Sequence, residues 1–137
     1  PKFLELEITE SALMDRADVS MRTLTGLRDL GISLAADDFG TGYSSLNYLR
    51  RFPLNAIKID RSFVTDIGGR GGGEKLAAAI IAIGQSLDLR VTAEGVETER
   101  QLAFLRQQWC DEIQGFYFSP PLSAPDFEEL VRVNKRL

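Results

Sequence analysis

Four short apolar runs in this chain contain or precede charged side chains, and this pattern restricts its fold more than any other feature. The runs and their charged residues are 4–9 with Glu7 and then Glu10, 32–36 followed by Asp37 and Asp38, 56–59 with Lys58 and then Asp60, and 90–93 followed by Glu94 and Glu97. Burying an unpaired ion costs several kcal/mol. The pattern therefore indicates that a hard divalent metal ion gathers these acids.

Segments with helical periodicity alternate with the apolar runs. The expected strands are residues 4–9, 32–37, 56–59, 90–93 and 112–118, and the expected helices are residues 18–30, 46–50, 74–87, 98–107 and a last one that starts at residues 123–126. Repeated strand-helix units predict an α/β fold with a parallel sheet covered by helices. In such folds the chemistry collects at the carboxyl ends of the strands, which is where these acids lie.

The run at residues 56–59 contains a lysine. Side chains alternate between the two faces of a strand, so Lys58 and Asp60 are expected on one face, with Ile57 and Ile59 on the other against helices. If the parallel sheet closes into a barrel, Lys58 points into its interior, and packing does not explain a lysine there. Two interpretations stay open, a functional cation or a structural ion pair with Asp60 or Asp37.

Composition excludes several classes of function. The 137 residues are 44% hydrophobic and 26% charged, which is typical of a soluble globular domain. The net charge of -4 argues against general nucleic-acid binding, which needs a basic surface. The chain has no histidine, so the usual general base and the usual zinc ligand are missing. Any hydrolysis must therefore use carboxylates, lysine and an oxygen-ligated metal ion.

The sequence also gives an expectation for the cellular compartment of the protein. The apolar stretch at residues 76–83 is far shorter than the roughly 20 residues that span a bilayer. The first residues do not have the pattern of a signal peptide, so none is expected at this point of the chain. Cys110 is the single cysteine, which excludes an internal disulfide and suits a reducing compartment. We expect a cytoplasmic domain, whose parent protein can still be tethered to a membrane.

Five motifs occur in a fixed order along nearly the whole chain. They are residues 6–11 (LEITES), 37–46 (DDFGTGYSSL), 57–60 (IKID), 93–98 (AEGVET) and 114–118 (QGFYF). In these motifs the chain resembles the EAL domain family, bacterial phosphodiesterases that hydrolyse cyclic di-GMP. The resemblance implies the C-terminal part of a TIM-like (β/α)8 barrel whose first strand runs against the others.

On this resemblance, residues 1–137 form a partial EAL domain. The Glu-Ala-Leu motif that names the family and an asparagine metal ligand are expected before Pro1. A complete barrel of this kind has about 250 residues, so five strands are too few to close it.

The resemblance also implies roles for single residues. Glu7, Asp37 and Asp38 resemble ligands of Mg²⁺ or Mn²⁺, with two ions expected. Glu94 resembles the catalytic glutamate, as general base or ligand, and Lys58 would orient the attacking water and stabilise charge on the phosphate. For Asp37 and Asp38 taken alone, a helix cap followed by a solvated turn is the alternative.

The remaining candidates have weaker support. Glu10, Glu97 and Asp60 are expected to contact the metal ligands or to hold a loop that closes over the site. For Glu10 and Glu97 the alternative is an acid at a helix N-terminus, where the helix dipole favours it. The resemblance places Gln114, Gly115 and Phe116 at the substrate. A buried glutamine that only satisfies backbone groups remains an alternative for Gln114, and core packing remains one for Phe116.

The leading hypothesis is a metal-dependent phosphodiesterase that opens cyclic di-GMP to the linear dinucleotide pGpG. The alternatives are a catalytically inactive module that senses cyclic di-GMP, or an inactive barrel fragment. Glu7, Asp37, Asp38, Lys58 and Glu94 are all present, which favours the enzyme. The complete protein is expected to form a homodimer and to carry sensory domains upstream.

Overall fold

The computed structural model describes residues 2–15, 17–42, 46–69 and 71–134. The strands are β1 (Glu5–Thr9), β2 (Ser33–Phe39), β3 (Ala56–Ile59), β4 (Arg90–Glu94) and β5 (Glu112–Gln114). The helices are α1 (Glu10–Asp15), α2 (Ala17–Asp29), α3 (Leu46–Arg51), α4 (Arg61–Thr65), α5 (Gly73–Ser86), α6 (Glu99–Gln107) and α7 (Ala124–Arg132). This alternation confirms the predicted α/β fold.

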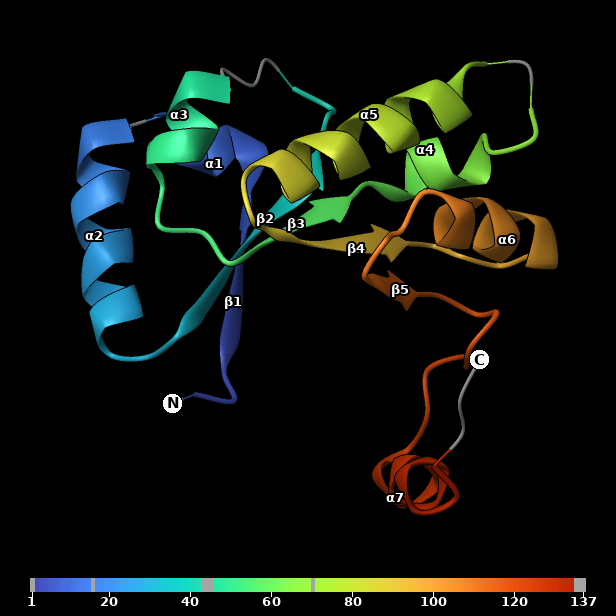
Figure 1. Cartoon of the computed structure of the whole chain (residues 1–137). Helices are drawn as coiled ribbons and strands as arrows, with labels where there is room; N and C mark the ends of the chain where they lie inside the picture. The colour runs from blue at the N-terminus through green and yellow to red at the C-terminus, as the bar shows by residue number, and fades with distance from the viewer. Residues whose placement is uncertain (1, 16, 43–45, 70, 135–137) are drawn as a thin grey trace.

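The strands form one sheet in the order β1-β2-β3-β4-β5, and each neighbouring pair is parallel. Parallel neighbours require crossover connections, which the helices supply. Figure 1 shows α3, α4 and α5 above the strands, whereas α7 lies apart from them near the bottom of the view. β1 and β5 are the two edges of the sheet.

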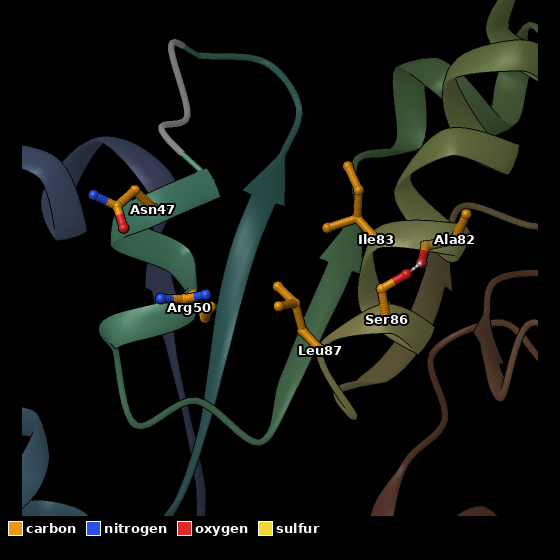
Figure 2. A pocket seen from close by; sticks show the side chains of 6 residues that line it. All are labelled: Asn47, Arg50, Ala82, Ile83, Ser86 and Leu87. Carbon is orange, nitrogen blue, oxygen red and sulfur yellow. Dashed lines mark hydrogen bonds between the residues drawn. The ribbon is translucent and has the colours of Figure 1, made fainter.

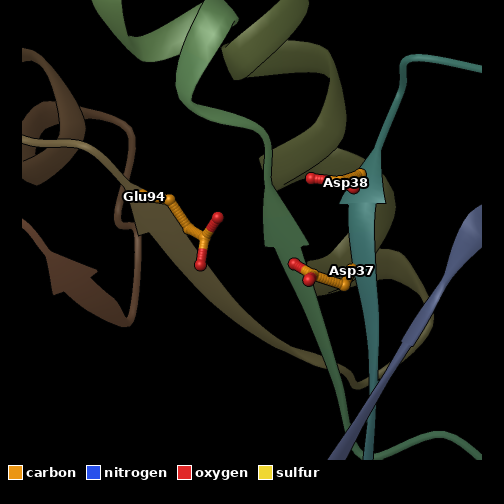
Figure 3. A group of neighbouring side chains, drawn as sticks. All are labelled: Asp37, Asp38 and Glu94. Carbon is orange, nitrogen blue, oxygen red and sulfur yellow. The ribbon is translucent and has the colours of Figure 1, made fainter.

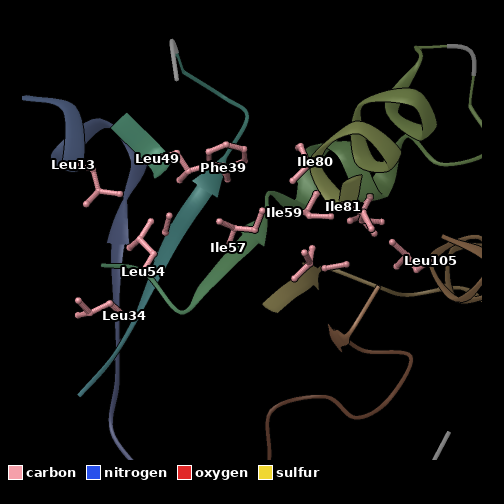
Figure 4. Close-up of a cluster of buried hydrophobic side chains, with 14 of the residues drawn as sticks. Leu13, Leu34, Phe39, Leu49, Leu54, Ile57, Ile59, Ile80, Ile81 and Leu105 are labelled. Atoms are coloured by element: carbon pink, nitrogen blue, oxygen red, sulfur yellow. The ribbon is translucent and has the colours of Figure 1, made fainter. Parts of the chain in front are cut away.

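One face of the sheet forms the hydrophobic core with the helices. Leu34, Ile57 and Ile59 are fully buried there, in one cluster with side chains such as Ile81 of α5 (Figure 4). Helix α5 approaches the strands closely at Gly84, because a Cβ atom at this position would lie 3.1 Å from Ile57 Cδ1. The apolar side chains of the expected strands therefore fix which face the helices cover.

The opposite face of the sheet carries charged side chains. At the amino ends of the strands, Arg90 on β4 pairs with Glu5 on β1 and, at 3.3 Å, with Glu112 on β5. Ser33 also donates a hydrogen bond of 2.7 Å to Glu5. The contact between Arg90 and Glu5 joins strands that are not neighbours in the sheet, so this face curves around a polar interior.

Helix caps and two short helices define the connections. Thr98 forms a capping box with Gln101 at the start of α6, and Ser123 caps α7. Helices α1 and α4 have six and five residues and were not predicted. Helix α4 begins after Asp60, whose side chain accepts a hydrogen bond of 3.0 Å from the Ser62 amide.

The prediction of a strand over residues 112–118 was wrong in its length, because β5 ends at Gln114. Beyond Gln114 the Tyr117 amide donates to the Val96 carbonyl at 2.9 Å, and the Phe118 amide donates to the Gly115 carbonyl at 3.1 Å. These bonds fold the chain into a turn against the segment that follows β4. Among the described residues, no helix combines the length and apolar character needed to cross a bilayer.

Cys110 lies between α6 and β5, where its Sγ is 3.4 Å from the carbonyl oxygens of Val91 and Glu112. Burial, with a smaller effect of the Asp111 carboxylate, raises the pKa of the Cys110 thiol to about 11. Since the thiolate is the reactive form, we expect Cys110 to react with iodoacetamide at pH 8 at least about tenfold more slowly than an exposed cysteine. Peptide mass spectrometry measures this rate. Equal labelling of the native and the urea-unfolded protein would contradict the prediction.

Candidate active site

Asp37 and Asp38 lie at a bulge near the carboxyl end of β2. The register between β2 and β3 shifts between Ala36 and Phe39, and Asp38 adopts a left-handed backbone conformation with a φ of 53°. Adjacent side chains of a regular strand point to opposite faces. Here both carboxylates turn toward the same side (Figure 3), while Phe39 returns to the buried core. The bulge therefore makes both aspartates available to one site.

Glu94, the last residue of β4, completes a group of acids with these aspartates. One carboxylate oxygen each from Asp37, Asp38 and Glu94 lies within 4.8 Å of the others. Figure 3 shows Glu94 pointing from β4, across β3, toward the two aspartates. The group forms at the carboxyl ends of the parallel strands, as the sequence predicted.

Lys58 lies at the centre of these acids and is 6% exposed. Its Nζ atom is 2.6 Å from Glu7 Oε1, 2.5 Å from Glu94 Oε1 and 3.7 Å from Asp37 Oδ1. Burial by itself would lower the pKa of Lys58, but the hydrogen bonds to Glu7 and Glu94 outweigh it and raise the pKa above its usual value. Lys58 is therefore a permanent cation within the acidic site.

Two features of the acids fit a divalent cation. Asp37 Oδ1 is buried and makes no hydrogen bond with the described residues. The neighbouring Asp37 carboxylate, followed by burial and by Asp60, raises the pKa of Asp38. A divalent cation beside the aspartates would neutralise this repulsion and give the buried oxygen a partner, and Mg²⁺ and Mn²⁺ prefer such oxygen ligands.

Glu10 lies behind the aspartates at the start of α1 and is 3% exposed. Its Oε2 atom accepts a hydrogen bond of 2.9 Å from the Gly40 amide, in the loop that follows Asp38. Its Oε1 atom has no hydrogen-bond partner among the described residues. Glu10 thus connects α1 to this loop. Residues 43–45, which belong to the same sequence motif, lie outside the described residues.

Glu97 and Asp60 each contact the start of helix α4. Glu97 Oε1 is 2.7 Å from the Arg61 guanidinium, and Asp60 caps α4. The ion pair expected for Lys58 is therefore made with Asp37, Glu7 and Glu94, while Asp60 bonds Ser62. Sequence reasoning did not identify Arg61, because the partner of an exposed arginine depends on how two loops meet.

Gln114, Gly115 and Phe116 line a cavity of about 210 Å³ next to Glu94. The alternative of Gln114 as a buried glutamine is wrong, because its side chain is exposed among the described residues. Phe116 is 63% exposed, so it is not part of the core either. The cavity therefore offers an amide and an aromatic ring beside the group of acids.

Another cavity, of about 480 Å³, lies on the helical side of the sheet. Figure 2 shows its lining, with Asn47 and Arg50 from α3 on one side, and Ile83 from α5 and Leu87, the residue after α5, on the other. The described residues that line it include no carboxylate. This cavity is thus separate from the acids, and the candidate active site is the one at the carboxyl ends of the strands.

Comparison with known proteins identifies the family. The family model of the EAL domain matches residues 1–121. The chain belongs to the EAL domain family. It is 56% identical over 130 residues to the cyclic di-GMP phosphodiesterase NbdA of Pseudomonas aeruginosa, covering 95% of this chain and 17% of NbdA.

Solved EAL structures share the fold. The PaMucR phosphodiesterase in complex with c-di-GMP superposes with a TM-score of 0.90 at 43% identity, covering 93% of this chain and 51% of that chain. BlrP1 of Klebsiella pneumoniae, in a manganese and cyclic di-GMP complex, has a TM-score of 0.80 at 37% identity, covering 88% of this chain and 31% of that chain. The EAL chain described here is therefore part of a TIM-like barrel, and it spans about half of PaMucR and less of the other two proteins.

Proposed function

We propose that the complete EAL domain containing this chain is a metal-dependent phosphodiesterase that opens one phosphodiester bond of cyclic di-GMP to give linear pGpG. The observation that carries the proposal is the convergence of Asp37, Asp38 and Glu94 around a buried, charged Lys58. NbdA, named a cyclic di-GMP phosphodiesterase, and the PaMucR complex with c-di-GMP support this substrate.

The metal ions of the proposed enzyme are Mg²⁺ or Mn²⁺, and two are expected. Asp37, Asp38 and Glu94 would hold one ion, and Glu7 with the upstream ligands would contribute to another. Such ions stabilise charge on a phosphoryl oxygen and acidify water, so no histidine is needed. BlrP1 structures with manganese and with calcium support a site for a divalent metal.

Lys58 and Glu94 are the proposed catalytic residues. The Lys58 ammonium stays protonated, so it can orient the attacking water and stabilise the negative charge that grows on the phosphate in the transition state. Glu94 lies beside Lys58 and the aspartates, where its carboxylate can accept a proton from water or bind a metal ion.

The other expected site residues support this centre. Gln114, Gly115 and Phe116 would contact the dinucleotide in the cavity beside Glu94, with Phe116 available to stack on a base. Glu10 would hold the loop after Asp38 through the Gly40 amide. Asp60 would support the site by capping α4, and Glu97 would support it through its ion pair with Arg61.

Incubating the complete domain with cyclic di-GMP and Mn²⁺, and separating the products by chromatography, tests the proposal. We expect pGpG to form in a single hydrolytic step. Binding of cyclic di-GMP with no product would contradict the enzyme and would instead support a sensor module.

Residues 1–137 expressed alone are expected to show no hydrolysis and to self-associate. The outer edges of β1 and β5 would have no partner strand, and unpaired edges recruit other chains. The acids would also lack the upstream ligands, so their mutual repulsion would oppose the fold. Light scattering and the product assay measure both properties. A soluble monomer that linearises cyclic di-GMP would contradict this prediction.

A further inference from the structure

Arg61 is the first residue of α4 and lies two residues after the end of β3, with the helix cap Asp60 between them. It lines the same cavity as Glu94, Gly95 and Glu97, the segment that follows β4. No role in the proposed reaction accounts for an arginine at this position. Its side chain contacts the turn at residues 95–98 in two ways.

The aliphatic part of Arg61 lies directly over Gly95. A Cβ atom at Gly95 would lie 2.9 Å from Arg61 Cδ and 3.1 Å from Arg61 Cβ, which is closer than carbon atoms pack. Gly95 also has a φ of 69°, a conformation that side chains other than glycine rarely adopt. Glycine at this position therefore lets the turn lie on the arginine stem.

The guanidinium of Arg61 reaches the other end of the same turn. Its Nη2 atom is 2.7 Å from Glu97 Oε1. Arg61 thus contacts the turn at Gly95 through its stem and at Glu97 through its charge. This double contact spans the residues that immediately follow Glu94.

The turn has further anchors on its other sides. The Val96 amide donates to the Gln114 carbonyl at 3.1 Å, next to β5. On the side of α6, Gln101 Oε1 accepts a hydrogen bond of 2.7 Å from the Glu97 amide. Arg61 supplies the contact from α4. Loss of this contact would free the side of the turn that faces the cavity and the acids.

We propose that Arg61 is a positioning residue of the metal site, which fixes the turn at residues 95–98 and so the direction of the Glu94 carboxylate. This inference rests on the proposed function. Glu94 is the residue before Gly95, and its carboxylate must meet both Lys58 and the aspartates. Because a glycine adjoins it, its backbone direction depends on what holds the turn.

A second ion pair of the chain provides a matched control. The side chains of Arg61 and Glu97 are 65% and 43% exposed, and those of Arg100 and Glu74 are 70% and 43% exposed. Exposed ion pairs contribute little to stability. Loss of either pair should therefore change stability equally little, and only loss of the Arg61 pair should change the metal site.

The test measures Mn²⁺ affinity of the complete domain by calorimetry, without substrate, for wild type, Arg61→Met, Arg61→Lys, Glu97→Gln and Arg100→Met. Arg61→Met keeps the stem and removes the charge, and Glu97→Gln removes the same ion pair from the other side. We expect both to weaken Mn²⁺ binding by about tenfold, as changes behind metal ligands do. Arg61→Lys should retain most of the affinity, and Arg100→Met should match wild type.

Amide hydrogen exchange and kinetics complete the test. Exchange at residues 95–98 should accelerate in Arg61→Met, and added Mn²⁺ should restore its kcat without a change in KM. Unchanged Mn²⁺ affinity in Arg61→Met and Glu97→Gln would overturn the proposal. So would a rise in KM that Mn²⁺ does not reverse, which would make Arg61 a substrate contact. If wild type binds Mn²⁺ but does not hydrolyse cyclic di-GMP, the proposed function fails while affinity and exchange still decide the role of Arg61.

Discussion

Replacing Lys58 with alanine in the complete domain should lower the turnover of cyclic di-GMP by about 10²-fold or more, because removing a group that stabilises charge in the transition state has an effect of this size. Substrate binding should remain largely intact, since the lysine charge is needed most once negative charge grows on the phosphate. The structure supports this expectation, because Lys58 is buried among Glu7, Asp37 and Glu94 and its raised pKa keeps it protonated. Turnover rates and KM values, together with substrate affinity in Ca²⁺, measure the two effects separately.

Lys75→Ala is the matched control for Lys58→Ala, because Lys75 is an exposed lysine on α5. It should leave both rate and affinity unchanged. If Lys58→Ala weakens binding and rate in equal measure, the lysine is a substrate clamp. If it changes neither, Lys58 is only a structural ion-pair partner, and the proposed catalytic role is wrong.

Asp38→Asn should have opposite effects on metal binding and on the stability of the metal-free protein. Removing one carboxylate from the acids should weaken Mn²⁺ binding by more than about 10²-fold, since even changes behind the ligands cost 10- to 100-fold. The melting temperature without metal should rise, because the raised pKa of Asp38 reports repulsion from Asp37 that the amide does not feel. Calorimetric titration with Mn²⁺ and thermal melts with and without metal measure both changes.

Asp29→Asn serves as the control, because Asp29 is an exposed aspartate at the end of α2. It should leave Mn²⁺ affinity unchanged, and any shift of its melting temperature, from removing an acid at a helix C-terminus, should be the same with and without metal. Undiminished Mn²⁺ affinity of Asp38→Asn would exclude Asp38 as a metal ligand. A lower melting temperature in the absence of metal would show that the Asp38 carboxylate does not destabilise the metal-free protein.

The sequence predicted the strands and most of the helices because their signals are local. Thr98 and Gln101 already form a capping box in the sequence, and the apolar run at residues 56–59 becomes β3. The prediction failed where tertiary contacts decide the backbone. Residues 115–118 are apolar enough for a strand, but their amides bond Val96 and Gly115 and end β5 at Gln114.

The sequence also predicted that Asp37, Asp38 and Glu94 lie near one another, because the carboxyl ends of parallel strands meet. It could not predict that both aspartates face the same way. In a regular strand they would point to opposite faces, and the left-handed conformation of Asp38 in a bulge changes this. The contact between Lys58 and Glu7 joins residues of strands that are not neighbours in the sheet, so it depends on the curvature of the sheet.

The most direct test is the rate of pGpG formation from cyclic di-GMP by one preparation of the complete domain, measured before and after metal removal. We expect excess chelator to abolish the rate, Mn²⁺ or Mg²⁺ to restore it, and Ca²⁺ alone to fail, because Ca²⁺ takes longer, looser coordination and is a poorer Lewis acid. Turnover that persists in excess chelator would contradict the account, because Asp37, Asp38 and Glu94 would then have no metal ion to hold.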